Sequence, residues 1–327
     1  MKNIFKKRIN IKPYEYPELL DYKDAIRHSY WLHTEYNLTS DIQNYKVDLN
    51  DNEREVVQRT MLAISQIEVN VKRFWGDLYK FIPKPEIDDV GGTFAESEIR
   101  HKDAYSFLLE KLGLNSEFEN ILNIPQLKGR IEYLEEFMNT KTKDKKGFVL
   151  SLILFSLFVE HISLFGQFLI LMSFNKERNF FKGLSNIVEA TSKEEEIHGK
   201  FGIELFNIIK KEHPEMFDDE MYSSLVDLST KALNAELNII DWIYEKGDLD
   251  FIPKDSIKEY IKSRFVKSLK VLSLKDIPNI FIPNENALHR VKWFDIEVLS
   301  TAEVDFFNKR SPAYSKKMQA FTPSNLF

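Results

Sequence analysis

The chain has 327 residues, of which 43% are hydrophobic and 29% are charged, and its formal net charge is −6. This length allows one large domain or two ordinary ones, and the acidic balance argues against a nucleic-acid partner, which would require a basic surface. The chain has no cysteine, which excludes disulfides, thiolate metal sites and cysteine nucleophiles and is consistent with a reducing, cytoplasmic environment.

The first half of the chain contains three predicted helices. Gly and Pro number only 11 each, so long stretches carry no helix breaker. Asp51 is expected to cap the first helix, whose apolar residues have helical spacing and which ends near residue 82. A break at the Gly-Gly-Thr sequence of residues 91–93 precedes a second helix over 93–112, which Gly113 ends. The third helix spans about 127–141.

Residues 148–174 form the most apolar stretch of the chain and follow a lysine-rich turn. They are long enough to cross a bilayer, but Glu160 and His161 lie in the middle, where a charge in lipid is costly. No strong Trp/Tyr belt flanks this single segment, and the basic N-terminus lacks the apolar core of a signal peptide. We therefore predict a buried central helix with a functional carboxylate, and no membrane partner.

The second half of the chain continues the helical pattern. Helices are predicted over about 177–212, 217–246 and 255–272, and no segment alternates with a period of two for long enough to indicate a sheet. The fold class is therefore all-α. Residues 311–327 contain Pro, Ser and Lys without a helical period and are expected to form a flexible tail.

Two Glu-x-x-His motifs carry the functional argument. The sequence EIRH contains Glu98 and His101, and EEIH contains Glu195 and His198. A Glu and a His three residues apart lie on nearly one helix face, so both can reach one ion, and these ligands suit iron, manganese or zinc. The number of such motifs is close to chance for this composition, and for one motif alone a salt-bridged Glu with an ordinary core His would be the better interpretation.

Two glutamates upstream of the motifs favour a metal site over a salt-bridged Glu with a core His. Glu68 precedes the first motif by 30 residues and Glu160 precedes the second by 35, each among apolar neighbours. A lone ionised carboxylate there would cost several kcal/mol, which a metal ion would offset. The order Glu, Glu-x-x-His, Glu, Glu-x-x-His is that of ferritin-like di-iron or di-manganese bundles, and four carboxylates balance two divalent ions.

Other polar residues near the motifs have less specific interpretations. Tyr105 lies four residues after His101, hence on the same helix face. A tyrosine beside a redox-active metal pair can be oxidised to a radical, and a core tyrosine with a local hydrogen bond remains the alternative. His161, Glu96 and Glu196 are expected to be solvated or to surround the ligands rather than to bind metal.

These motifs resemble the small, radical-generating subunit of class I ribonucleotide reductase. The matching segments are FAESEIRHKDAY, TSKEEEIHGKFG, SYWLHTEYN and VDFFNKRSPAYSKK. The resemblance covers nearly the whole chain and implies a ferritin-like domain over 1–310 that holds two metal ions. It also implies a homodimer, a tail over 311–327 that docks on the large subunit, and the reduction of ribonucleotides by a ribonucleoside-diphosphate reductase, whose formal reaction has a thioredoxin-type disulfide as acceptor in the reverse direction.

The resemblance also implies a radical-transfer path. An oxidising equivalent would leave the metals through His101, the neighbouring carboxylate Glu194 and Trp31, and would cross to the large subunit through Tyr314. Tyr105 occupies the position of the family's radical tyrosine.

The chain departs from the common family pattern at two positions. Glu68 and Glu194 stand where most members have Asp. Some members with Glu at the first position resemble a subclass with a dimanganese cofactor, activated by superoxide, whose nearby tyrosine stays unoxidised. Manganese is therefore favoured over iron. Two alternatives stay open: a stand-alone ferritin-like di-metal oxidase or monooxygenase, which would not need the tail, and a helical scaffold without metal.

Overall fold

The computed structural model describes residues 2–140, 144–274 and 276–299, and for 68–70 and 136–140 it describes the backbone alone. The described part is a bundle of long helices without an extended strand; a single bridge joins Leu249 and Ile252. The predicted all-α class is confirmed.

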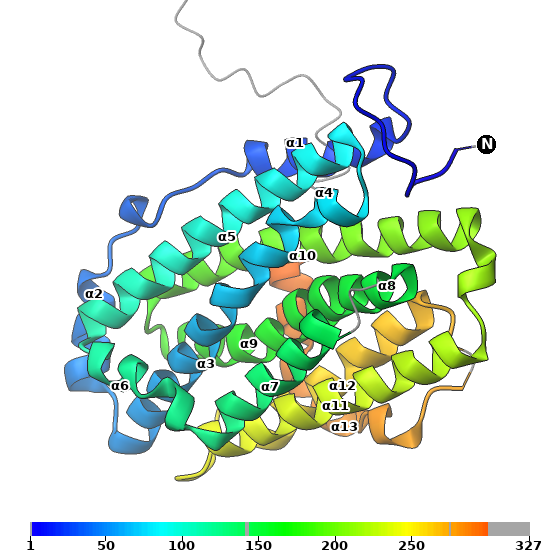
Figure 1. Ribbon diagram of the computed structural model, residues 1–327. Coiled ribbons are helices and arrows are strands. Elements are labelled where there is room, and N and C mark those ends of the chain that lie inside the picture. Colours follow the sequence, from blue (N-terminus) through cyan, green and yellow to red (C-terminus); the bar gives the residue numbers. More distant parts are fainter. Residues whose placement is uncertain (1, 141–143, 275, 300–327) are drawn as a thin grey trace, which may run out of the picture.

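Four long helical segments form the centre of the bundle (Figure 1). They are α3 (Asp51–Gly76), α5 (Pro85–Leu112), a continuous run of α8 (Lys145–Ile153), η5 (Leu154–Ser163) and α9 (Leu164–Arg178), and α10 (Lys182–Glu212). Helix α3 packs against α5 and α9, and α10 packs against η5 and α9. The Glu-x-x-His helices and the apolar segment therefore share one core.

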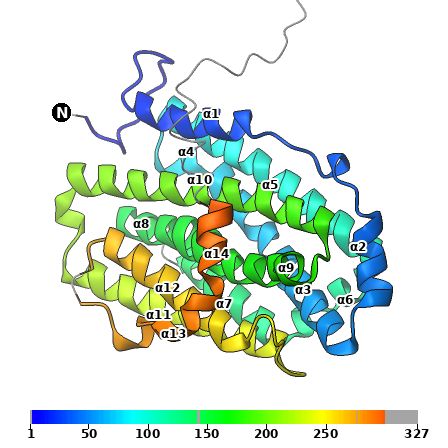
Figure 2. The ribbon, with the colours of Figure 1, turned by 180° about the vertical axis from the view of Figure 1, so that it is seen from behind.

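Shorter or peripheral helices cover this centre on opposite sides. Helix α1 (Leu20–His28) packs on α5 and α10, whereas α7 (Pro125–Thr140), α11 (Asp219–Ile243) and α12 (Lys254–Val271) cover the other side (Figure 2). The smaller helices α2 (Thr39–Gln43), α4 (Leu78–Phe81), α6 (Asn115–Glu119), α13 (Glu285–Leu288) and α14 (Lys292–Phe294) complete the bundle.

The start of α3 differs by one residue from the prediction. Asn50, not Asp51, is the cap: its side chain accepts a hydrogen bond from the Glu53 N–H at 2.9 Å, and the Glu53 carboxylate accepts from the Asn50 N–H at 3.1 Å. This reciprocal capping box satisfies two backbone donors. The helix ends at Gly76, and residues 78–81 form the separate α4 rather than its continuation.

The predicted break at residues 91–93 is wrong, because α5 runs without interruption from Pro85 to Leu112. Gly91 has a packing role instead: a Cβ atom there would lie 2.6 Å from the Trp75 carbonyl oxygen on α3. The absent side chain allows α3 and α5 to approach closely. The predicted stop at Gly113 agrees with the structure, where this residue adopts the left-handed conformation with φ of 81°.

The apolar segment is a core helix, as predicted. One helix in the described part, Lys145–Arg178, is long and apolar enough to span a bilayer, and 94% of its most apolar window is buried inside the bundle. Its middle part, η5, is π-helical. Such widened turns occur frequently at functional sites, and η5 carries Glu160.

Candidate metal centre

Three elements bring five of the six predicted ligands together. Helix α5 carries Glu98 and His101, the π-helical segment η5 carries Glu160, and α10 carries Glu195 and His198. The three-residue spacing within each motif directs the Glu and the His of one helix to the same interior point. At most 1% of the surface of each residue is exposed.

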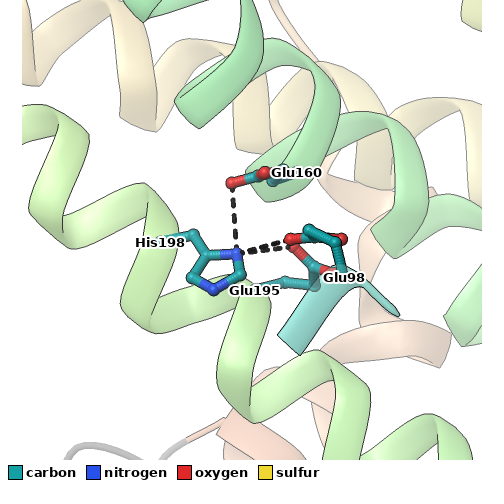
Figure 3. A group of neighbouring side chains, drawn as sticks. All are labelled: Glu98, Glu160, Glu195 and His198. Carbon is teal, nitrogen blue, oxygen red and sulfur yellow. Dashed lines mark ion pairs between the residues drawn. The ribbon is translucent and has the colours of Figure 1, made fainter. Parts of the chain in front are cut away.

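The side chains converge on one point (Figure 3). One ligand atom each from Glu98, Glu160, Glu195 and His198 lies within 4.8 Å of the others. His198 Nδ1 is 3.0 Å from a Glu98 oxygen and 3.4 Å from an oxygen of Glu160 and of Glu195. His101 Nδ1 lies 3.0 Å from Glu195 Oε1 and 3.4 Å from Glu98 Oε2.

The potential metal-ligand atoms at this point are buried and make no hydrogen bonds within the described part of the chain. They are Glu98 Oε1, Glu160 Oε2, both Glu195 oxygens, and Nδ1 of His101 and His198. Buried polar groups almost always have a hydrogen-bond partner, and the close contacts of these oxygens are ion pairs with the two Nδ1 atoms at 3.0–3.4 Å. Carboxylate oxygens and imidazole nitrogens without other partners are the ligands expected around divalent iron or manganese, so the residues present fit a metal site.

The two histidines are oriented by bonds to their outer nitrogens. His101 Nε2 lies 2.7 Å from Glu194 Oε2, and His198 Nε2 lies 3.1 Å from Ser97 Oγ. Each ring therefore directs Nδ1 to the centre. Metal-binding histidines characteristically have such a partner on the second nitrogen, which fixes the ring and raises its basicity.

The cluster strongly perturbs its own protonation. Burial raises the pKa of Glu160 to about 8, with its close contact to His198 opposing this rise. Burial alone would raise the pKa of Glu98 too, but contacts with His101 and His198 outweigh it and hold that pKa below its usual range. Burial would lower the pKa of each histidine, yet the surrounding carboxylates raise both well above the usual value. Without a cation, the cluster retains protons.

The side chains of two predicted site residues lie outside the described part of the structure. The backbone at position 68 belongs to α3, which packs along α5, but the Glu68 side chain is not among the described residues. Tyr314 and the remainder of the 311–327 tail are also outside.

Glu194 and Trp31 both lie beside His101. Arg100 contacts both oxygens of Glu194, at 3.1 and 3.2 Å, and its Nη1 donates to the Trp31 carbonyl at 3.4 Å. The Trp31 and His101 rings stack with centroids 5.9 Å apart and an interplanar angle of 17°. Trp31 Nε1 has no hydrogen-bond partner among the described residues, so its contact with His101 is made through the ring faces.

Tyr105 is fully buried on α5.

Glu96, His161 and Glu196 were expected not to bind metal, and their side chains contact other residues. Glu96 is half-exposed and accepts a hydrogen bond from Arg100 Nε at 3.0 Å. His161 Nε2 lies 2.7 Å from Glu196 Oε2, and both side chains are largely buried.

Two residues that the sequence did not single out contact Glu160 and Glu194. The Trp75 indole N–H donates to Glu160 Oε1, and Arg100 holds Glu194. Each had a signal in the sequence. Trp75 follows Glu68 by seven residues and so lies on the same face of α3, and Arg100 follows Glu96 by four.

Comparison with known proteins points to one family. Residues 8–281 match the family model described as "Ribonucleotide reductase, small chain". A probable ribonucleoside-diphosphate reductase small subunit of Invertebrate iridescent virus 6 is 27% identical over 96% of this chain and 95% of its own length.

Two solved structures share the fold. A putative class I ribonucleotide reductase from Bacillus halodurans has a TM-score of 0.76 at 16% identity, covering 85% of this chain and 99% of its own. A dimanganese(II) NrdF of Streptococcus sanguinis has a TM-score of 0.69 at 16% identity, covering 88% and 98%.

Proposed function

The chain belongs to the ribonucleotide reductase small-chain family, and we propose that its buried cluster holds the two metal ions that store an oxidising equivalent for the large subunit. As a small subunit of this reductase it is part of an oxidoreductase that reduces ribonucleotides. One observation carries the assignment of the site: buried ligand atoms from α5, η5 and α10 converge without hydrogen-bond partners among the described residues.

Six residues would hold the metal ions: Glu68, Glu98, His101, Glu160, Glu195 and His198. When bound, the ions supply one-electron oxidising chemistry. The protein's part is to exclude water, since every described ligand is at most 1% exposed, and to fix the ligands, since Trp75 donates to Glu160 and Ser97 contacts His198.

We propose manganese rather than iron as the native metal. Two points support this choice: Glu replaces the common Asp at position 68, and a fold relative is described with a dimanganese(II) cofactor. Carboxylate and imidazole ligands suit both metals. Metal analysis after expression, with electron paramagnetic resonance after activation, distinguishes manganese from iron and shows whether Tyr105 carries a radical.

The path of the oxidising equivalent is proposed to begin at His101 and Trp31. Their rings stack, Glu194 Oε2 lies 2.7 Å from His101 Nε2, and Arg100 forms an ion pair with Glu194. From Trp31 the equivalent would reach the large subunit through Tyr314.

The organisation of the subunit follows from the same proposal. Residues 1–310 would form the di-metal domain, 311–327 would dock on the large subunit, and two copies would pair as a homodimer in the cytoplasm. In the direction of ribonucleotide reduction, a thioredoxin-type dithiol would supply two electrons and two protons through the large subunit and would itself become the disulfide, which is the acceptor of the reverse reaction.

The direct test is reconstitution with metal, oxidant and the cognate large subunit. We expect deoxynucleotide formation with the full chain, and loss of that activity with an unchanged metal content after deletion of residues 311–327. If the truncated protein kept full oxidase activity on a small substrate and the full chain formed no deoxynucleotide, a stand-alone oxidase would be the correct function.

A further inference from the structure

Arg264 lies on α12, outside the metal cluster, yet its guanidinium contacts the residues that directly follow two ligands. Its Nε donates to the His161 carbonyl oxygen at 2.6 Å, and its Nη2 donates to Glu196 Oε2 at 3.2 Å. His161 follows Glu160 on η5, and Glu196 follows Glu195 on α10. One planar group therefore spans the two segments that carry these carboxylates.

The position of this guanidinium is itself strongly constrained. The Arg264 side chain is 4% exposed, and its Cζ lies 3.7 Å from the centroid of the Phe165 ring. Its Nη1 donates to Tyr260 Oη at 3.2 Å, and Tyr260 in turn donates to Asp295 at 2.7 Å. Stacking and a fork of fixed donors are properties that lysine does not share, so the geometry of the group depends on arginine.

The contacted carbonyl belongs to the π-helical part of the apolar helix. A charge-assisted hydrogen bond to a buried carbonyl is stronger than a neutral one, so it can hold the backbone beside Glu160 in place. Gly199 of α10 also lies against His161, since a Cβ atom there would be 3.0 Å from three of its side-chain carbons. His161 is thus held between α10 and Arg264.

We propose that Arg264 is a positioning residue that sets the separation of the Glu160 and Glu195 carboxylates, and thereby how tightly the pair of metal ions is held. This inference rests on the proposed metal-binding function. Arg264 touches neither a ligand side chain nor a metal-binding atom in the described contacts; it acts through the backbone of η5 and through Glu196.

Arg59 provides a matched control. Its guanidinium also donates to a helix carbonyl, that of Trp242, and to two glutamates, Glu55 and Glu245, and it also lies over an aromatic ring. None of these residues neighbours a candidate ligand. Substitution of Arg59 therefore removes the same types of interaction without touching η5 or α10.

The experiment compares metal-free wild type with Arg264→Gln, Arg264→Lys and Arg59→Gln. Manganese(II) affinity is measured by calorimetry, the exchange coupling of the bound ions by electron paramagnetic resonance, and fold by circular dichroism and thermal unfolding. We expect Arg264→Gln to weaken manganese binding by about 10-fold, the lower end of the range that follows loss of a direct partner of a ligand, because Arg264 acts one residue further out, and to change the exchange coupling. Arg59→Gln should lower the unfolding midpoint and leave both metal properties unchanged.

The outcomes separate the two claims. Wild-type affinity and coupling in Arg264→Gln, or equal losses in Arg59→Gln, would overturn the positioning role while leaving the metal site intact. Absence of manganese and iron binding in the wild type would overturn the proposed function and this inference with it. If Arg264→Gln does not fold, Arg264→Lys decides, because it keeps the charge and loses the fork: weaker binding supports the proposal, and unchanged binding rejects it.

Discussion

At the scale of single residues, Glu160 is a proposed metal ligand whose pKa is strongly raised. Burial raises its pKa to about 8, and the neighbouring carboxylates raise the pKa of His101 and His198 well above the usual value. In the metal-free protein these groups therefore hold protons at neutral pH. Metal binding requires deprotonated ligands, so protons and metal ions compete for the cluster.

We predict that manganese binding releases protons and that the apparent affinity rises as the pH increases from about 6 towards 8. The sign follows from the raised pKa of Glu160: below its pKa of about 8 the carboxyl must lose a proton on binding, and above that value it is already ionised. Calorimetry in two buffers with different ionisation enthalpies measures the number released at each pH. A proton release of zero throughout this range would contradict the prediction.

Glu194 contacts two charged or polar neighbours at once. Both of its oxygens contact Arg100, and Oε2 also contacts His101 Nε2. Trp31 Nε1 is left without a hydrogen-bond partner among the described residues. Glutamate at this position, one methylene longer than the aspartate common in the family, thus engages an arginine and a histidine while the tryptophan contributes its ring face.

At the scale of elements, two glycines of α10 allow this helix to lie against η5. A Cβ atom at Gly199 would press on His161, and one at Gly202 would overlap the side chain of Ser156. Ser156 is fully buried and donates to the Leu152 carbonyl at 2.7 Å. The approach of α10 to the π-helical segment, on which the cluster depends, therefore requires the absence of side chains.

We predict that Gly202→Ala destabilises the protein by about 1–3 kcal/mol or more, the usual cost of overpacking a tight core. Thermal and urea unfolding of the metal-free protein measure this change. Gly92→Ala is the matched control: it lies within α5, and a Cβ there meets no atom within 4 Å. That variant should gain about 0.4–1 kcal/mol through the lower entropy of the unfolded chain. Equal stability changes in both variants would refute the packing argument.

At the scale of the whole molecule, a second buried polar group joins the helices away from the metal cluster. Arg130 on α7 lies 3.7 Å from Glu236 on α11 and donates to the Ala63 carbonyl on α3 at 3.1 Å. Gln167 on α9 donates to Glu236 at 3.3 Å. Arg130, Glu236 and Gln167 are each 0% exposed, so this group links four helices within the core.

We predict that Glu236→Leu costs about 3–5 kcal/mol, because it leaves the Arg130 charge buried without its partner. The double variant Arg130→Met with Glu236→Leu should recover much of this loss, since well-packed apolar residues often replace a buried ion pair without penalty. Urea unfolding of both variants provides the measurement, with manganese affinity as the control that should stay unchanged. A double variant as unstable as the single one would show that the pair itself is not the source of the cost.

The helical class, the apolar core helix and the set of candidate ligands could all be predicted from the amino-acid sequence. The Glu-x-x-His spacing places Glu98 with His101, and Glu195 with His198, on common faces because the helix backbone fixes residues three apart on one side. Glu160 was recognisable because an unpaired carboxylate in an apolar helix is costly. These arguments depend only on local geometry and local burial. The Glu68 assignment rests on the same kind of argument, whereas the Tyr314 assignment rests on the family resemblance alone, and both stay predictions.

Only the tertiary structure decided how the helices meet. The sequence predicted a break near Gly91, whereas the structure uses that glycine for the contact between α3 and α5. The structure also revealed the hydrogen bond from Trp75 to Glu160 and the contacts by which Arg264 connects η5 with α10. In the sequence, Arg264 is separated from Glu196 by 68 positions and from His161 by 103 positions. Such contacts depend on the close approach of packed helices, which periodicity along one helix does not specify.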